Sequence, residues 1–243
     1  MILQFRNLVS LTFIGMIFFS PSLPAQTVAS DLESTITKIR HGSLEAQEAA
    51  RIGVPCPERP SDVDRQDVSF SGEIQLIVVQ AYSVRSRCDD RAIILFRRTD
   101  SGLTHVQTIL LHAYYGEQPV VTFPELIKPG EREILIRGQI VDKGTGIEQR
   151  NITIYKFTNG RFEVVFDAPE IVHFEIPGGT QLYQLNQKSS FEFVHSGSPD
   201  VSIQEKQVIT RGRGSTTRYR GCTWSPELLR FRCYERASVA RIQ

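Results

Sequence analysis

The side chains best suited to chemistry in this chain are four arginines near its C-terminal end, and the chemistry that they suggest is anion binding. An Arg-Gly-Arg-Gly segment at 211–214 is closely followed by two more arginines. The glycines leave the backbone free to bend, and a guanidinium group pairs well with phosphate or carboxylate oxygens. We therefore expect a flexible basic rim that binds a phosphate, an acidic glycan or a lipid head group. The candidate ligand-binding residues are Arg211, Arg213, Arg218 and Arg220.

The charge of the chain is segregated, although its overall value is close to zero. Residues 206–243 carry nine basic and two acidic side chains, which give a net charge of +7. Residues 26–205 carry 18 basic and 25 acidic side chains, which give a net charge of −7. The basic end either binds a partner, docks on the acidic part of the same chain, or forms a solvated face. Nucleic acid is not an expected partner, because residues 26–243 together have 27 basic and 27 acidic side chains.

The four cysteines predict two disulfide bonds, because an even number of cysteines in an exported chain normally forms disulfides. Residues 218–236 are predicted to form a hairpin that turns at 226–229. Placing Ser225 opposite Arg230 aligns three pairs on one face of this hairpin. Cys56 and Cys88 then pair by elimination, and no spacing of Cys and His supports a metal site instead. The three aligned pairs are Trp224 with Phe231, Cys222 with Cys233, and Arg220 with Glu235.

Catalytic groupings are missing from the sequence. The histidines are scattered singly, and no Gly-x-Ser-x-Gly segment surrounds a nucleophile. The segments Gly144-Thr145-Gly146 and Gly212-Arg213-Gly214 have no strand-to-helix context, which indicates turns rather than a phosphate-binding loop. We therefore expect no cofactor and no metal. A hydrolase that gathers carboxylates from separate strands stays open as an alternative, because linear spacing does not reveal such a site.

The first 25 residues have the pattern of a secretory signal peptide. Arg6 precedes an apolar run from Leu8 to Phe19, and Ala25 offers a small residue for cleavage. Cleavage after Ala29 is the alternative. The run is short for a membrane span, which needs about 20 residues, so a membrane anchor is expected only if the signal stays uncleaved. The sequence predicts an exported protein of the periplasm or the extracellular space.

Residues 26–67 are expected to form a helical hairpin followed by a linker. Apolar residues recur at helical spacing from residue 32, and Gly42 is suited to end a first helix. Ser43 is suited to cap a second helix that runs to residue 52. The stretch 53–67 is rich in proline and acidic residues, which is typical of a linker, and Cys56 would hold it in place.

From residue 68 to residue 243 the pattern predicts an antiparallel β domain. Arg161 to Asp167 alternates between apolar and charged residues, and Asn159-Gly160 is a strong hairpin turn that places Phe157 opposite Phe162. Similar groups of strands recur, near 68–112, 118–168 and 180–236. The sequence therefore predicts three antiparallel four-stranded units, like propeller blades in an incomplete ring, with a β-sandwich as the alternative.

One of these units carries a family resemblance. Residues 120–126, then Gly130, then residues 133–136 resemble one blade of the FG-GAP or VCBS type of exported β-propeller. The resemblance implies radial four-stranded sheets. Blades of that type usually carry an acidic calcium loop, but here Lys128 and Pro129 occupy the matching positions, so calcium binding is not implied for this chain.

These features favour an exported, non-catalytic binding or scaffold protein of the cell envelope or extracellular space. The expected partners are an anionic glycan, a lipid head group or an envelope protein. The alternatives are an envelope-polymer hydrolase and an inhibitor or accessory subunit that inserts the 211–220 loop into an enzyme.

Overall fold

The computed structural model describes residues 32–71, 74–83, 90–100, 102–112, 119–144, 146–178, 181–195, 201–212 and 214–236. Within these ranges the chain is mainly β, and every strand pairing is antiparallel, as predicted. The predicted signal peptide falls outside these ranges, so export stays a prediction. None of the helices within them is both long and apolar enough to cross a membrane.

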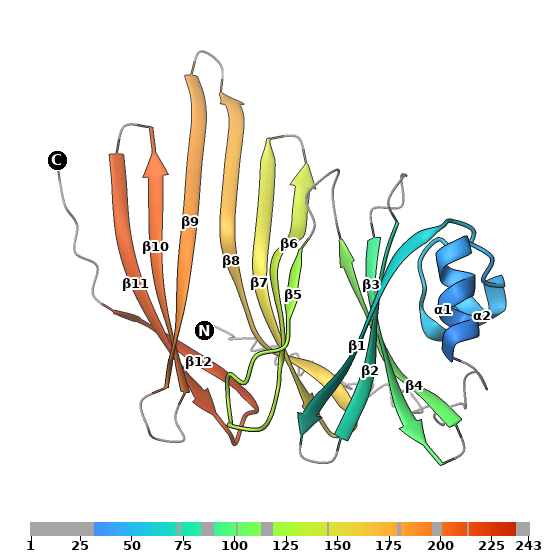
Figure 1. The fold of residues 1–243 in the computed structure, drawn as a ribbon. Coiled ribbons are helices and arrows are strands. Elements are labelled where there is room, and N and C mark those ends of the chain that lie inside the picture. The colour runs from blue at the N-terminus through green and yellow to red at the C-terminus, as the bar shows by residue number, and fades with distance from the viewer. Residues whose placement is uncertain are drawn as a thin grey trace, which may run out of the picture.

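The described residues form two sheets, and in each of them the strands follow one another in sequence order (Figure 1). The small sheet consists of β1 (Ser61–Ser71), β2 (Ile74–Ser83), β3 (Asp90–Thr99) and β4 (Gly102–His112). The large sheet consists of β5 (Val120–Thr122), β6 (Ile134–Gly144), β7 (Ile147–Thr158), β8 (Arg161–Gly178), β9 (Gln181–His195), β10 (Val201–Arg211), β11 (Gly214–Ser225) and β12 (Arg230–Arg236).

Two helices, α1 (Leu32–His41) and α2 (Ala46–Ile52), cover the outer face of the small sheet. Helix α1 ends at Gly42, whose φ of 63° suits a residue without a side chain. The expected capping role of Ser43 is wrong. Its hydroxyl donates to the carbonyl of Lys38 at 3.4 Å, and α2 begins after Glu45, which makes no side-chain cap.

The linker expected at 53–67 is shorter than its composition suggests, because β1 begins at Ser61. Asp62, Asp64 and Asp67 lie on an edge strand, where polar side chains are tolerated because one edge faces solvent. Val63 packs against the helices, while Val68 and Phe70 point to the opposite face. The alternation of a strand was therefore present but was masked by the charges.

The inner strands β2 and β3 are apolar on both faces because both faces are covered. Ile77, Val79 and Ile94 pack with the helices, whereas Val78 and Ile93 pack toward the large sheet. The second of these clusters also contains Ile134, Ile136 and Phe162 of the large sheet, so the two sheets share one core.

A side-chain amide also joins the two sheets. Gln107 on β4 accepts a hydrogen bond from the backbone N–H of Phe162 at 2.7 Å, and its Nε2 donates to the Phe162 carbonyl at 3.2 Å. Phe162 in turn packs edge-on against Phe70 of β1, with 4.8 Å between ring centroids. The start of β8 is therefore fixed against the small sheet.

The large sheet coils, so that strands far apart in its order touch. Phe166 on β8 and Phe231 on β12 pack edge-on with 5.8 Å between ring centroids, although three strands separate β8 from β12 in the sheet. A second core fills this bend. Its buried members are Leu126, Ile127, Leu135, Ile152, Ile154, Val165, Phe166, Ala168, Val201, Ile203, Cys222, Trp224 and Phe231.

The predicted C-terminal hairpin is confirmed in its register. Ser225 lies opposite Arg230, and the three predicted pairs lie opposite one another. Cys222 and Cys233 form a disulfide bond. The predicted partner of Cys56 is Cys88, which lies outside the described residues, so that second pairing stays a prediction. The Asn159-Gly160 turn and its pair Phe157 with Phe162 are also confirmed.

The division into three separate blade-like sheets is not confirmed. Strands β8 and β9 pair continuously from Ile171 opposite Lys188 to Gly178 opposite Gln181. This pairing joins the second and third predicted units into one open sheet of eight strands. The sequence pattern indicates how many strands each unit contains. It does not show whether the edge strands of successive units pair with each other.

Candidate binding surface

Strands β9–β11 of the large sheet lie away from the small sheet and the helices. In Figure 1 the small sheet and the helices lie beside β5–β8, while β9–β11 form the opposite end. Many side chains on these last strands are exposed or half-buried on both faces. This end of the sheet is where the sequence places its candidate ligand-binding arginines.

Three of the four candidate arginines share one face of the β10–β11 hairpin. Arg211 lies opposite Gly214 at the tip, Gln207 lies opposite Arg218, and Glu205 lies opposite Arg220. Because strand side chains alternate, these arginines point to the same side of the sheet. Arg213 lies outside the described residues. We call this side the arginine face; it consists of Phe191, Glu205, Arg211, Arg218, Arg220 and Trp224 with their neighbours.

Arg220 is engaged within the protein. Its Nε donates to the Oε2 of Glu205 at 2.5 Å, and Glu205 is only 2% exposed. The hydroxyl of Ser189 on β9 donates to the other oxygen of Glu205 at 2.9 Å. The guanidinium group thus neutralises a buried carboxylate, and we assign Arg220 a structural role in this face.

Sequence reasoning missed Glu205, because the hairpin register pointed to Glu235 as the partner of Arg220. The register does place Glu235 opposite Arg220 on β12, but the guanidinium binds to the strand on its other side. The sequence contained one indication of this pairing. Glu205 follows Val201 and Ile203 at every second position, so it lies on the same side of the strand as these two buried residues. A carboxylate in phase with buried residues needs a cationic partner.

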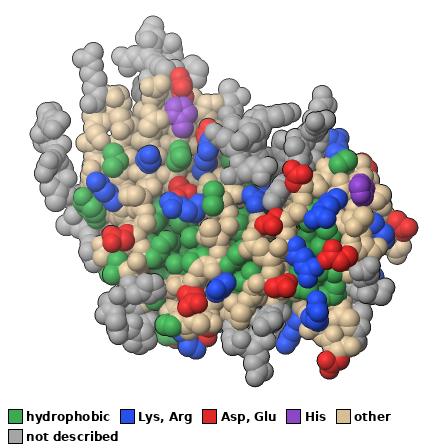
Figure 2. Space-filling model, viewed as in Figure 1, with side chains coloured by type: hydrophobic (Ala, Val, Ile, Leu, Met, Phe, Trp, Pro, Cys, Tyr) green, Lys and Arg blue, Asp and Glu red, His purple; other side chains and the backbone are tan. Residues whose placement is uncertain are grey.

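Arg211 and Arg218 are exposed, and neither makes a hydrogen bond or ion pair with another residue that the structure describes. Farther along the same face, the aromatic side chains of Phe191 and Phe193 are half-buried against the second core. Figure 2 shows hydrophobic side chains gathered over the lower half of the large sheet, among scattered Lys and Arg side chains. The arginine face therefore offers, beside an apolar area, two cations that have no partner among the described residues.

A second charged group surrounds the loop before β6, which is the stretch that resembles a blade loop. Glu133 is fully buried, and its Oε2 accepts hydrogen bonds from the backbone N–H groups of Leu126 at 2.8 Å and Ile127 at 3.3 Å. The Nζ of Lys156 donates to Glu131 at 2.7 Å and to Glu133 at 3.3 Å. These bonds satisfy the carboxylates with groups of the protein itself, so the cluster serves to hold the loop.

The environments of the two carboxyl groups shift their pKa values in opposite directions. Burial raises the pKa of Glu133, against the hydrogen bonds that it accepts. Burial also acts to raise the pKa of Glu131, but hydrogen bonds from Lys128 and Lys156 outweigh it and lower that pKa. Two carboxyl groups with diverging pKa values also occur in glycoside hydrolases, but here Glu133 faces backbone N–H groups in the interior.

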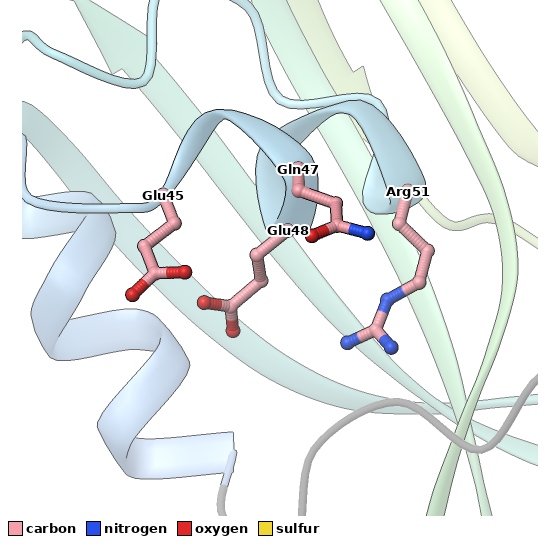
Figure 3. A pocket seen from close by; sticks show the side chains of 4 residues that line it. All are labelled: Glu45, Gln47, Glu48 and Arg51. Atoms are coloured by element: carbon pink, nitrogen blue, oxygen red, sulfur yellow. The ribbon is translucent and has the colours of Figure 1, made fainter.

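A depression of about 500 Å³ lies beside α2 (Figure 3). The described residues that line it are Glu45, Gln47, Glu48 and Arg51. In Figure 3 the side chains of Glu45 and Glu48 extend to the same side of the helix. Glu48 forms an ion pair with Lys38 of α1 at 2.9 Å. This pairing ties the two helices together and leaves a polar, open surface.

Two of the described histidines have shifted pKa values. Burial lowers the pKa of His105, whose Nε2 lies 2.9 Å from the hydroxyl oxygen of Thr108. A hydrogen bond with Asn186 raises the pKa of His173 on the exposed part of β8. Among the residues that the structure describes, no three His, Cys, Asp or Glu side chains are grouped to hold a metal ion.

No protein-family model, no curated protein and no solved structure matches this chain.

Proposed function

We propose that this chain is an exported, non-catalytic binding or scaffold protein of the cell envelope or extracellular space, and that it binds an anionic ligand through the arginine face. The observation that carries this proposal is the pair Arg211 and Arg218, which lie exposed on one side of the same hairpin without a partner in the described part of the chain.

The electrostatics of this face support an anion as the ligand. Arg220 and Glu205 neutralise each other, so Arg211 and Arg218 contribute the net charge of this side of the β10–β11 hairpin. Guanidinium groups bind phosphate, sulfate and carboxylate oxygens through paired hydrogen bonds. A rigid sheet fixes the spacing of the two groups, which lowers the entropy lost when a ligand binds.

We also propose that the strands form three copies of one blade-like unit. Three successive groups of four strands, β1–β4, β5–β8 and β9–β12, run along the chain as antiparallel meanders. This order supports three copies of one four-stranded unit, of which the last two have joined through β8 and β9. In this interpretation, the third copy keeps an uncovered surface for binding.

The test is retention of the chain from residue 26 to residue 243 on heparin–agarose and on vesicles of phosphatidylglycerol. The variant Arg211→Ser/Arg218→Ser should elute from heparin at clearly lower salt, because each lost cation removes one anion contact. The control Arg97→Ser/Arg98→Ser removes two exposed arginines from β3 of the small sheet and should elute like the parent protein. Unchanged retention of the first variant on both matrices would refute binding at the arginine face.

A further inference from the structure

The opposite side of the same strands carries two exposed aromatic residues. Tyr219 on β11 is 42% exposed and Tyr234 on β12 is 48% exposed. Tyr234 lies opposite Gly221, and Tyr219 lies two residues before Gly221 on the same strand. The two tyrosines are therefore diagonal neighbours on one face, with Cα atoms about 7–8 Å apart, which is within reach of a single extended ligand.

Gly221 makes room for one of these rings. A Cβ atom added to Gly221 would lie 3.0 Å from the Cε2, Cζ and hydroxyl oxygen of Tyr234. The ring thus lies across the glycine, close to the strand backbone, while 48% of the residue remains exposed. A ring held flat on a sheet presents a wide apolar surface at a small entropic cost, because tyrosine has only two side-chain torsions.

Several cations share this face with the two rings. Lys206 lies directly opposite Tyr219 on β10, and Arg232 lies two residues before Tyr234 on β12. Lys188 on β9 also points to this side, and Glu192 is the acidic residue among the described strands there. We call this side the tyrosine face; its residues are Lys188, Glu192, Lys206, Tyr219, Arg230, Arg232 and Tyr234. Its described charged side chains on β9–β12, four basic and one acidic, give a net charge of +3.

We propose that the tyrosine face binds an acidic glycan, with sugar rings stacked on Tyr219 and Tyr234 and with sugar carboxylate or sulfate groups paired with Lys206 and Arg232. The apolar C–H face of a sugar ring matches an aromatic ring, and its acidic groups match the adjacent cations. This inference rests on the proposed function and extends it, since it names the ligand class and adds a second face.

A glycan fits this surface better than a bilayer or a nucleic acid. The Tyr234 ring lies along the sheet, whereas side chains that enter a membrane must project into the acyl region. Stacking on tyrosine would also suit single-stranded nucleic acid. The predicted export signal, however, directs the protein to compartments where acidic glycans are the more accessible polymers.

The experiment measures the affinity of a heparin oligosaccharide for the chain from residue 26 to residue 243 by calorimetry. The variant Tyr219→Ser/Tyr234→Ser should bind at least about tenfold more weakly, as expected when two stacking contacts are lost. The variant Tyr219→Phe/Tyr234→Phe keeps both rings and should bind within about twofold of the parent. Affinity that is unchanged in the serine variant would overturn the inference.

A second pair of variants keeps the test valid if the serine variant folds poorly. Gly221→Ala should lift the Tyr234 ring and weaken binding, whereas Gly214→Ala on the same strand meets its nearest atom at 3.7 Å and should not. Inorganic polyphosphate has no sugar ring, so its binding should be the same for the serine variant and the parent. Oligothymidylate that binds as tightly as heparin, with the same dependence on the tyrosines, would assign the face to nucleic acid and overturn the inference.

The two proposals fail separately. If Arg211→Ser/Arg218→Ser loses heparin binding and the tyrosine variants do not, the arginine face stands and the inference about the tyrosine face falls. If the tyrosine variants lose heparin binding and Arg211→Ser/Arg218→Ser does not, the tyrosine face is the glycan site. The arginine face is then not part of the proposed function.

Discussion

Glu205 and Arg220 form a directly hydrogen-bonded ion pair, with 2.5 Å between Oε2 and Nε, beneath the surface of the arginine face. The carboxylate is almost completely buried, while the guanidinium group is 33% exposed. A buried carboxylate without its cation is costly, because the charge is then neither hydrated nor neutralised. The pair therefore supports the last strands of the sheet and leaves Arg211 and Arg218 available for a ligand.

Removal of Arg220 should destabilise the protein more than removal of Arg218. Arg220→Met leaves Glu205 buried without its cation, and we expect a loss of about 2–3 kcal/mol in the free energy of unfolding. Arg218→Met is the control on the same strand and face, and it should change that free energy by less than about 0.5 kcal/mol. Urea unfolding measures both values.

A double variant tests whether the loss comes from the pair itself. Arg220→Met/Glu205→Leu removes both charges, and it should be more stable than the sum of the two single changes predicts, by about 1–3 kcal/mol. Simple additivity of the two single effects would show that the side chains act independently and would contradict the structural role of Arg220.

Removal of the Cys222–Cys233 disulfide should lower the free energy of unfolding by about 3 kcal/mol, since the bond closes a short loop and restricts the unfolded chain. The variant is Cys222→Ala/Cys233→Ala. The adjacent cross-strand pair provides the control as Thr223→Ala/Arg232→Ala, which should have a much smaller effect. A loss below about 1 kcal/mol in the cysteine variant would show that the bond does not stabilise the hairpin.

The pH dependence of stability should reveal the raised pKa of Glu133. A carboxyl group whose pKa is higher in the folded state destabilises the fold as pH rises from its unfolded value, about 4.3, through the folded value. Glu133→Gln removes this titration. The free energy of unfolding of the variant, relative to the parent protein, should therefore rise as pH increases above about 4.3, until the folded-state pKa of Glu133 has been passed.

Glu131 should show the opposite slope, because its pKa is lowered in the folded state. Its stabilising contribution is complete above about pH 4.3 and is lost as pH falls through the lower folded value. The stability of Glu131→Gln relative to the parent should therefore fall as pH rises from about 3 to about 4.5. The same slope for both variants would contradict the assigned environments.

Gly146 should tolerate alanine much less well than Gly138, although both have positive φ values of 78° and 74°. A Cβ atom at Gly146 would lie 1.9 Å from the carbonyl oxygen of Glu175, whereas one at Gly138 meets nothing within 4 Å. We expect Gly138→Ala to cost about 1 kcal/mol and Gly146→Ala to cost at least about 3 kcal/mol. Equal losses, measured by urea unfolding, would contradict the close approach of β8 to this turn.

The sequence predicted best where several local signals coincided. Three cross-strand pairs agreed on one register for the hairpin from Arg220 to Glu235, and that register is confirmed. The Asn159-Gly160 turn was equally well determined, because its backbone conformation restricts the residues that fit. Helix α1 followed from the helical spacing of Leu32, Ile36 and Ile39, all of which are buried.

Relationships between distant segments were not visible in the sequence. The continuous pairing of β8 with β9 depends on the relative placement of two units, and no local pattern encodes it. The choice of Glu205 over Glu235 by Arg220 depends on burial across three strands. The tyrosine face was also missed, because Tyr219 and Tyr234 become neighbours only once their strands pair around Gly221.

Both proposals place the ligand on the C-terminal strands of the large sheet, away from the small sheet. The most direct test is amide hydrogen exchange of the chain from residue 26 to residue 243, with and without a heparin oligosaccharide. We expect added protection in peptides from residues 201–236 and unchanged exchange in the small sheet at 61–112. Protection confined to the small sheet or to the depression beside α2, with none in residues 201–236, would contradict both proposals.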